Sequence, residues 1–269
     1  MNLALLYYTG TGVEQCNKNA QYWLEEAVAF DNAEAANVLG TFYRDGVFDD
    51  KEHLIEEKLS EECRSYEEKR KLEEKRLRKE NDLEKAAKLF EKSASLGNSE
   101  GLSNLGIFYG TGIHFKKDFE KAFNYFKQAA DKEHAVALCN LGLYYEEARG
   151  VARDLEQALE CFKKSARLGY VGAEYEIARW YSQGKHIKKS NIIAAKLYYS
   201  AANQGYAPAL VQLAICYRHG HGVRKNKRKA MILVGMALAK GDSSAKMYLE
   251  TFKGEEQIMI VEPFKKIGD

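Results

Sequence analysis

LGIFYGTGI at residues 105–113 and LGLYYEEARGV at residues 141–151 are two copies of one pattern, and they begin 36 residues apart. We call the first leucine of each copy an anchor. The same 36-residue spacing links most of the other anchors, and one step is longer by 30 residues. The anchors are Leu3, Leu39, Leu105, Leu141, Ile177, Leu213 and Leu249. A period of this length indicates an array of equivalent structural units rather than one globular core.

Other columns keep the register of the anchors. A tyrosine stands four residues after six of the anchors, and a glycine stands seven residues after five of them, with Ala148 as the exception. Later in each unit come an alanine, a large apolar residue and a small residue, as at Ala122, Phe126 and Ala129. Such spacings place side chains on one face of an α-helix, and the glycine marks a helix end.

Each unit therefore reads as two antiparallel helices, with the anchor and the tyrosine in the core. The residue after the anchor is Gly or Ala, which lets another helix approach closely. Neither helix can bury its apolar face alone, so neighbouring units must stack. The predicted fold is all-α, a right-handed superhelical α-solenoid of antiparallel helix pairs. The predicted units are 1–32, 33–98 with an insertion at 49–81, 99–134, 135–170, 171–206 and 207–242, followed by capping helices in 243–269.

At this point the pattern resembles a known family. LGIFYGTGI, LGLYYEEARGV and CYRHGHGV (216–223), each followed by a helix that begins with a KA or QA pair, are similar to the Sel-one-like repeat family, a relative of tetratricopeptide repeats. The resemblance covers nearly the whole chain outside residues 49–81. It implies an adaptor role in assembling protein complexes, in signalling or in bacterial contact with host cells. Some cysteine-rich relatives carry a disulfide in each unit, but this chain lacks the regular cysteine pair.

Composition narrows the possible classes of protein. The 269 residues hold 41 Lys and Arg against 39 Asp and Glu, a balance that argues against a chain built as a whole to bind nucleic acid. Two prolines leave room for helices, and five cysteines favour reduced thiols. No apolar run is long enough to span a membrane, and the N-terminus has no basic leader. We expect a cytoplasmic protein, although a trimmed leader or leaderless secretion would fit as well.

The segment 49–81 is dominated by charge, with EEKLSEECRSYEEKRKLEEKRLRKE at its centre. Glu, Lys, Arg and Leu favour helix, and acid–base pairs at i,i+3 and i,i+4 add support. We expect the helix to run on into the second helix of its unit. Three interpretations stay open: a solvated protrusion, a docking arm or coiled-coil half for a second partner, and disorder.

Motifs for chemistry are scarce. TGTG at 9–12 and HGHG at 219–222 occupy the turn column of the repeat, so turns explain them. His219 and His221 lack a third metal ligand, and Cys216 stands in the column of Phe108 and Trp180, where we expect core. We therefore predict no catalytic residues, no metal and no cofactor. The alternative is an enzyme, such as the hydrolase activity ascribed to cysteine-rich relatives of the resembled family.

The first helices of a stacked array line its concave face, and residues offset from the anchors should face that groove. These are the columns one and two before, and two and five after, each anchor. They can hydrogen-bond the backbone of an extended peptide, or face only water. The predicted partner-binding residues are Asn104, Asn140, Glu176, Gln212, Tyr175, Arg179, Glu146 and Arg218.

The leading hypothesis is therefore a non-catalytic scaffold that binds a protein or peptide in the groove. One basic stretch, Arg218 to Lys229, reads as a solvated turn and helix start or as a surface for an acidic partner, RNA included. An RNA-binding solenoid that uses this stretch is a further alternative, although nucleic acid is not the partner we favour.

Overall fold

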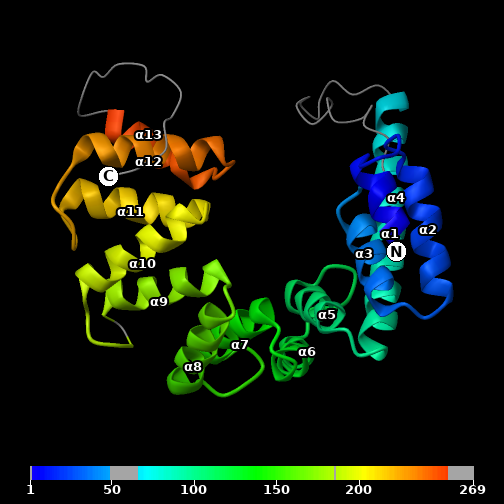
Figure 1. Ribbon diagram of the computed structural model, residues 1–269, viewed down its shortest axis with the longest axis horizontal. Coiled ribbons are helices and arrows are strands. Elements are labelled where there is room, and N and C mark those ends of the chain that lie inside the picture. Colours follow the sequence, from blue (N-terminus) through cyan, green and yellow to red (C-terminus); the bar gives the residue numbers. More distant parts are fainter. Residues whose placement is uncertain (1, 49–65, 185, 254–269) are drawn as a thin grey trace. The chain divides into compact units, whose positions relative to one another are not determined.

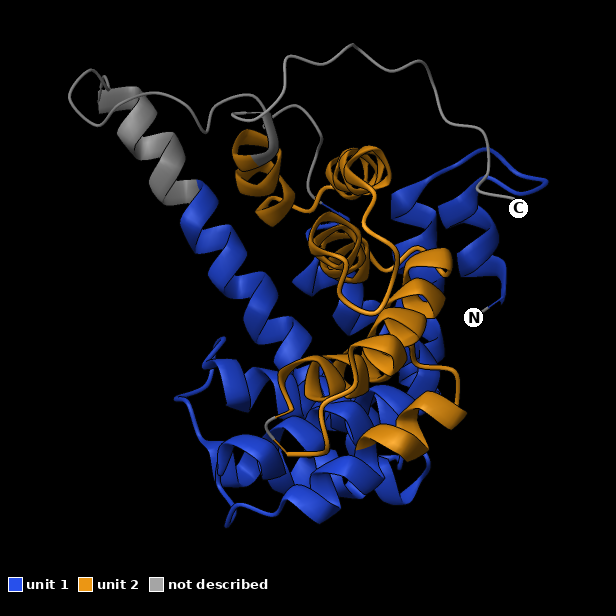
Figure 2. Ribbon diagram, turned by 90° about the vertical axis from the view of Figure 1, so that its left-hand side faces the viewer, with its two compact units in different colours: residues 1–161 blue, residues 162–269 orange. Residues whose placement is uncertain are grey.

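The computed structural model describes residues 2–48, 66–184 and 186–253, and these residues form thirteen α-helices and no β-strand (Figure 1). The chain divides into two compact units, Met1–Cys161 and Phe162–Asp269, which we call unit 1 and unit 2 (Figure 2). The all-α fold class predicted from the repeat is confirmed.

Unit 1 contains the first seven helices, and α8 (Leu155–Arg167) begins in unit 1 and ends in unit 2. The helices of unit 1 are α1 (Asn2–Thr9), α2 (Asn17–Ala29), α3 (Ala33–Arg44), α4 (Tyr66–Ser95), α5 (Ser99–Thr111), α6 (Phe119–Asp131) and α7 (Ala135–Glu147). The other helices of unit 2 are α9 (Val171–Gln183), α10 (Asn191–Asn203), α11 (Ala207–His219), α12 (Lys227–Ala239) and α13 (Ser244–Lys253).

Within each unit, helices that follow one another in the sequence pack together. In unit 1, α1 packs on α2, α3 on α4 and α5 on α6, and each such pair also contacts the next helix along the chain. In unit 2 the same holds for α9 with α10 and α11 with α12. Apart from α3 and α4, between which the charged segment is inserted, short connections join these pairs, as expected for the antiparallel hairpins of the repeat.

The predicted packing columns are buried, except that the anchors Ile177 and Leu249 are only half-buried and Leu3 is exposed. The anchor leucines from Leu39 to Leu213 are at most 6% exposed, and the alanine and large columns of the second helices are at most 2% exposed. A Cβ added at Gly40 would lie 2.8 Å from the ring of Phe90, and one at Gly106 would lie 2.7 Å from the ring of Phe126. The residue after the anchor is therefore small because an aromatic ring of the second helix lies against the backbone there.

The glycine column ends the first helices in the left-handed conformation. Gly112, Gly184 and Gly220 have φ of 81°, 64° and 79°, which glycine adopts without steric cost. Ala148, the exception in the column, adopts the same conformation with φ of 56°. The repeat thus imposes this turn even where the residue is unfavourable.

The tyrosine column does not form the centre of the core, and that part of the prediction was wrong. All six of these tyrosines are half-buried, whereas the residue one position earlier is buried in Phe42, Phe108, Tyr144, Trp180 and Cys216. One residue turns the side chain about a quarter of the way round the helix, so only the earlier position points directly between the paired helices. At the half-buried position, the tyrosine hydroxyl can form polar contacts, and that of Tyr43 accepts a hydrogen bond from Gln21 Nε2 at 3.0 Å.

The second helix of the enlarged unit, α4, is continuous from Tyr66 to Ser95, which matches the expected run of the charged segment into this helix. Residues 49–65, and residues 254–269 of the predicted capping region, lie outside the described residues. The unit boundaries and the roles of the charged segment remain predictions.

Candidate functional site

The predicted partner-binding residues lie on the first helices of their hairpins, namely α5, α7, α9 and α11. Seven of the eight are partly exposed, and Glu146 is 7% exposed. Burial of Glu146 departs from the predicted groove position. The structure thus leaves most of this face open to solvent, although several of the side chains have contacts within the chain.

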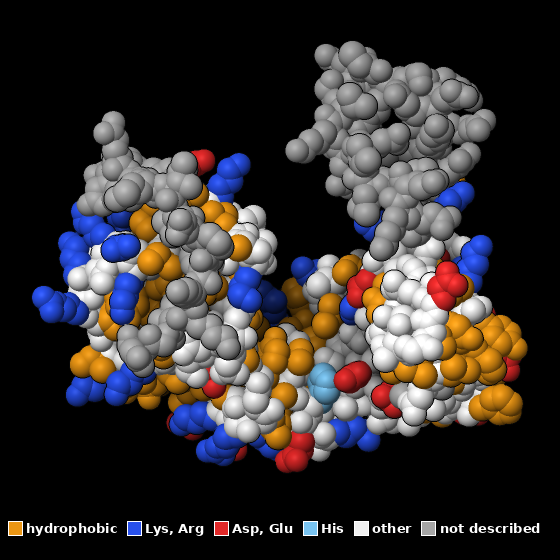
Figure 3. All heavy atoms as spheres, turned by 45° about the horizontal axis from the view of Figure 1, so that its top comes forward, with side chains coloured by type: hydrophobic (Ala, Val, Ile, Leu, Met, Phe, Trp, Pro, Cys, Tyr) orange, Lys and Arg blue, Asp and Glu red, His pale blue; other side chains and the backbone are white. Residues whose placement is uncertain are grey.

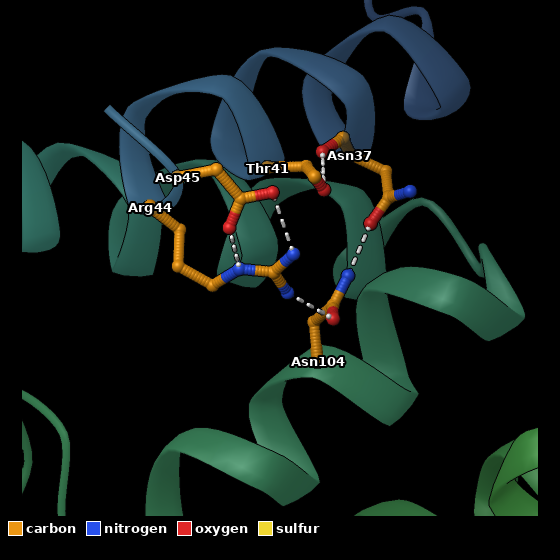
Figure 4. Close-up of polar contacts among 5 residues, drawn as sticks. All are labelled: Asn37, Thr41, Arg44, Asp45 and Asn104. Carbon is orange, nitrogen blue, oxygen red and sulfur yellow. Dashed lines mark hydrogen bonds and ion pairs between the residues drawn. The ribbon is translucent and has the colours of Figure 1, made fainter. Parts of the chain in front are cut away.

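In unit 1, side chains from α3 and α5 meet in a polar cluster that we call the α3–α5 bridge (Figure 4). Asn104 Nδ2 donates to Asn37 Oδ1 at 2.8 Å, and Arg44 Nη1 donates to Asn104 Oδ1 at 3.1 Å. Arg44 also holds the neighbouring Asp45 with two hydrogen bonds, of 2.7 and 3.1 Å. The Asn104 amide is therefore engaged on both its donor and its acceptor side.

Asn37 explains why the bridge forms. Its side chain is 4% exposed, and besides accepting from Asn104 it donates to Glu100 Oε2 at 2.7 Å. A buried amide left without hydrogen-bond partners would destabilise the fold. The partners of Asn37 lie on α5, so the bonds that satisfy its amide also join the first helices of two successive hairpins. Asn104 consequently stabilises the stack, and its availability to a peptide is smaller than the sequence suggested.

The position two before the anchor was expected to face the groove, and this was wrong for four of its five members. Asn37, Ser103, Cys139 and Val211 are all buried. The fifth member, Tyr175, is half-buried, and its ring lies 5.7 Å from that of Tyr198 and 5.5 Å from that of Tyr206. For Asn37, the cover comes from α5, the first helix of the next hairpin, as the bridge shows.

In unit 2, α9 presents an ion pair on the same face. Arg179 Nε donates to Glu176 Oε2 at 2.6 Å, and the two side chains are 25% and 16% exposed. Because the residues are three apart on one helix, the pair holds both charged groups in a defined position. A partner would therefore meet an arginine and a glutamate whose side chains are already ordered.

Next to this pair lies a cavity of about 180 Å³ in unit 2. Its lining comes from α9, α10 and α11 and includes the predicted Gln212. The residues are Ser182, Lys189, Asn191, Ala194, Tyr198, Gln212, Ile215, Cys216 and His221. Ser182 is not among the predicted partner-binding residues. It stands five residues after the anchor Ile177, as Arg218 does after Leu213, and this spacing could have found it.

A cysteine and a histidine that share a cavity raise the question of nucleophilic catalysis. Burial raises the pKa of the Cys216 thiol to about 11, so the thiol is protonated at neutral pH and is a weak nucleophile. Burial likewise raises the pKa of Tyr198 to about 12. Ser182 Oγ donates to the Arg179 carbonyl oxygen at 2.9 Å. The lining thus offers hydrogen-bonding groups, and its thiol is held in the protonated form.

Arg218 lies in the last turn of α11, where it begins the basic stretch, and it is half-buried. A second, more open cavity of about 580 Å³ lies along this stretch, and Tyr217, Val223, Arg224, Lys225, Asn226 and Lys229 line it. His219 and His221 stack at 5.4 Å. Across the described parts of the chain, no three His, Cys, Asp or Glu side chains are placed to hold a metal ion. None of the described helices is long and apolar enough to cross a membrane.

The chain matches a known family of repeat proteins. The model of the Sel1 repeat matches residues 1–29, 76–98, 99–134, 135–170, 171–206 and 207–242. No curated protein matches the chain.

Several solved structures share the fold. A Sel1 repeat protein from Oxalobacter formigenes is 23% identical with a TM-score of 0.71, and the alignment covers 89% of this chain and 86% of that one. A protective antigen of uropathogenic Escherichia coli is 22% identical with a TM-score of 0.56, covering 94% and 56%. A sel1 repeat protein from Klebsiella pneumoniae is 14% identical with a TM-score of 0.55, covering 87% and 99%. At these identities the likeness shows the fold alone.

Proposed function

This chain belongs to the Sel1-repeat family, and from that premise we propose that it is a non-catalytic scaffold that holds a partner protein or peptide on the surface of its first helices. Sel1-repeat proteins generally act as protein-interaction scaffolds. The observation that carries the proposal is that the packing columns of the repeat are buried, while polar side chains between them on the same helices stay partly exposed.

The residues that support this role differ between the units. In unit 1, Asn140 on α7 is partly exposed, while Asn104 is held in the α3–α5 bridge. In unit 2, the Glu176–Arg179 pair and Gln212 lie on α9 and α11. Arginine is enriched among the residues that dominate binding energy at protein interfaces, and an ordered side chain loses less entropy on binding. We therefore assign the larger share of binding to the Glu176–Arg179 pair.

A charge swap tests the assignment. The double substitution Glu176→Lys with Arg179→Glu keeps an ion pair at the same spacing, so the melting temperature should change little. The matched control is Glu84→Lys with Lys88→Glu on α4, where the exposed pair also lies at 2.6 Å. Wild type, swap and control are each used as bait in the cognate cell lysate, and the retained proteins are quantified by mass spectrometry.

Each protein that the wild type and the control retain, but the α9 swap loses, is then purified and titrated against all three. We expect the swap to weaken binding by about tenfold or more, as for a central charged pair at an interface. Equal affinity of a purified partner for the wild type and the α9 swap would remove this face from the binding surface.

A further inference from the structure

The near-neutral charge of the whole chain hides a strong division between the two units. Unit 2 carries 19 Lys and Arg against 8 Asp and Glu, whereas unit 1 carries 22 against 31. Their formal charges are therefore +11 and −9. Lys and Arg side chains gather over the surface of unit 2 (Figure 3). A field of one sign on one compact unit attracts ligands of the opposite sign.

The cations of unit 2 are concentrated at the turns inside its two complete hairpins. Lys188 and Lys189 precede α10, and Arg224 and Lys225 hold the equivalent positions 36 residues later, before α12. The second turn packs against the start of α10, directly after the first turn, because a Cβ added at Gly222 would lie 2.0 Å from the carbonyl oxygen of Asn191. We call the exposed side chains of Lys188, Lys189, Arg224, Lys225, Arg228 and Lys229 the basic edge.

The basic edge is hollowed by the open cavity of about 580 Å³. Arg224, Lys225 and Lys229 line it, and its described lining includes no carboxylate. The ammonium group of Lys229 lies 5.6 Å from the centre of the Tyr217 ring, which places this cation over the floor of the cavity. A volume of this size accommodates several side chains of a bound polypeptide.

Most cations of the basic edge have no carboxylate partner in the part of the chain that the structure describes. Among the described residues, no carboxylate forms an ion pair with Arg224, Lys225, Arg228 or Lys229. Arg228 and Lys229 also lie in the first turn of α12, where the helix dipole disfavours positive charge. Like charges gathered this closely repel one another, and bound carboxylates would relieve that repulsion.

The structure favours a polypeptide over a nucleic acid as the anionic ligand. Proteins that bind single-stranded nucleic acid without sequence preference usually offer exposed aromatic rings for base stacking. Among the described Phe, Trp and Tyr side chains of unit 2, only Tyr199 is exposed, and it lies on α10 rather than on the turns. The exposed rings near the basic edge are the imidazoles of His219 and His221, which stack on each other. Tyr217 is half-buried beneath Lys229. Among the described residues, the basic edge therefore offers charge and a cavity but no exposed Phe, Tyr or Trp ring on which bases could stack.

We propose that the basic edge binds an acidic, extended segment of a partner protein. The choice of a protein rests on the scaffold function proposed above, whereas the anionic character of the ligand follows from the edge itself. The edge lies on the turns and the first-helix face lies on α9 and α11, so the two surfaces can be tested separately.

The test measures binding of a fluorescent dodecapeptide that alternates Glu and Gly, with a peptide that alternates Gln and Gly as the uncharged probe. The full chain should bind the Glu peptide alone, with an affinity that falls as salt is added. Arg224→Glu with Lys225→Glu should weaken binding by about tenfold or more. The matched control, Lys163→Glu with Arg167→Glu, makes the same change of charge on exposed residues of α8 in unit 2 and should weaken it less than about threefold.

Three results would overturn the proposal: equal weakening by the two variants, equal binding of the two peptides, or tighter binding of an oligouridylate of the same length, which would assign the edge to nucleic acid. Circular dichroism checks that each variant is folded, and Arg224→Gln with Lys225→Gln replaces the reversal if that variant unfolds. The α9 swap should leave binding of the Glu peptide unchanged. Failure of the basic edge and failure of the first-helix surface are therefore distinguishable.

Discussion

Unit 1 and unit 2 share their buried columns but begin their helices with different side chains. In unit 1, the first helices α3, α5 and α7 start at Asn32, Asn98 and His134, whose side chains accept hydrogen bonds from the backbone. At the equivalent positions in unit 2, Tyr170 and Tyr206 make no capping hydrogen bond through the side chain. Tyr206 instead packs its ring 5.5 Å from that of Tyr175.

The second helices differ in charge as well. Asp118 accepts a hydrogen bond at the start of α6, and Asp154 does so at the start of α8. Ser190 and Asn226 take over this role before α10 and α12 in unit 2. The repeat therefore constrains which residues are buried, whereas the residues at the helix N-termini and the surface charges differ between the units. Differences in binding between the units should therefore come from these positions.

The largest expected effect concerns the buried position one residue before the repeated tyrosine, which both units share. Phe108→Ala in unit 1 and Trp180→Ala in unit 2 should each lower the free energy of unfolding by about 3–5 kcal/mol, because both side chains are at most 1% exposed. Cys216→Ala removes a single sulfur from the same column and should cost about 1 kcal/mol. Urea denaturation checks all three. Equal losses would show that the cost does not follow the buried volume.

Ala148 in unit 1 can be compared with the glycines at the same position. A left-handed conformation costs a residue with a Cβ about 1–2 kcal/mol, so Ala148→Gly should raise the free energy of unfolding by about 1 kcal/mol. Gly112→Ala is the reverse change and should lower it by about 1–2 kcal/mol. Thermal denaturation of the two variants tests the pair, and a destabilised Ala148→Gly would contradict the assignment of strain.

The histidine cap should make unit 1 sensitive to mild acid. His134 Nδ1 accepts from the backbone N–H of Ala137 at 3.2 Å, and burial lowers the pKa of this histidine. In the unfolded chain, the imidazole of His134 takes up a proton near pH 6.5, whereas in the folded chain it does so only at a lower pH. The free energy of unfolding therefore falls as the pH drops through and below about 6.5. His134→Asn should keep the cap, worth about 1 kcal/mol, without that dependence.

Denaturation midpoints of the wild type and His134→Asn, measured from about pH 8 to about pH 5, check this expectation. The two curves should run together near pH 8 and separate as the pH falls. Parallel curves over the whole range would mean that His134 does not contribute to the acid sensitivity.

The smallest expected effect concerns the basic start of α12. Asn226→Asp should raise the free energy of unfolding by about 0.3–1 kcal/mol, because a carboxylate there faces the positive end of the helix dipole. Asp118→Asn at the matching position of α6 should lower it by a similar amount. Both effects should shrink in high salt. A destabilising Asn226→Asp would mean that the clustered cations are already balanced.

The fold could be predicted from the sequence because the same packing requirement recurs in every repeat and selects the same kind of residue each time. The anchors, the alanines and the glycines recur at one spacing. Gly106 shows the physical reason for one of these columns, because the ring of Phe126 leaves no room for a Cβ there. The columns of Phe108 and Tyr109 were both expected in the core, and the structure buries Phe108 fully but Tyr109 only in part. Periodicity alone does not separate two adjacent positions that both face the partner helix.

The candidate site depended far more on tertiary structure. From the sequence, Asn104, Tyr175 and Glu176 all read as polar or amphipathic residues offset from the core. Only the packed helices decide that Asn104 bonds to Asn37, that Tyr175 packs on Tyr206, and that Glu176 holds Arg179. The reason is that period and burial are properties of one helix, whereas partners, cavities and the gathering of charge depend on residues brought together from several helices.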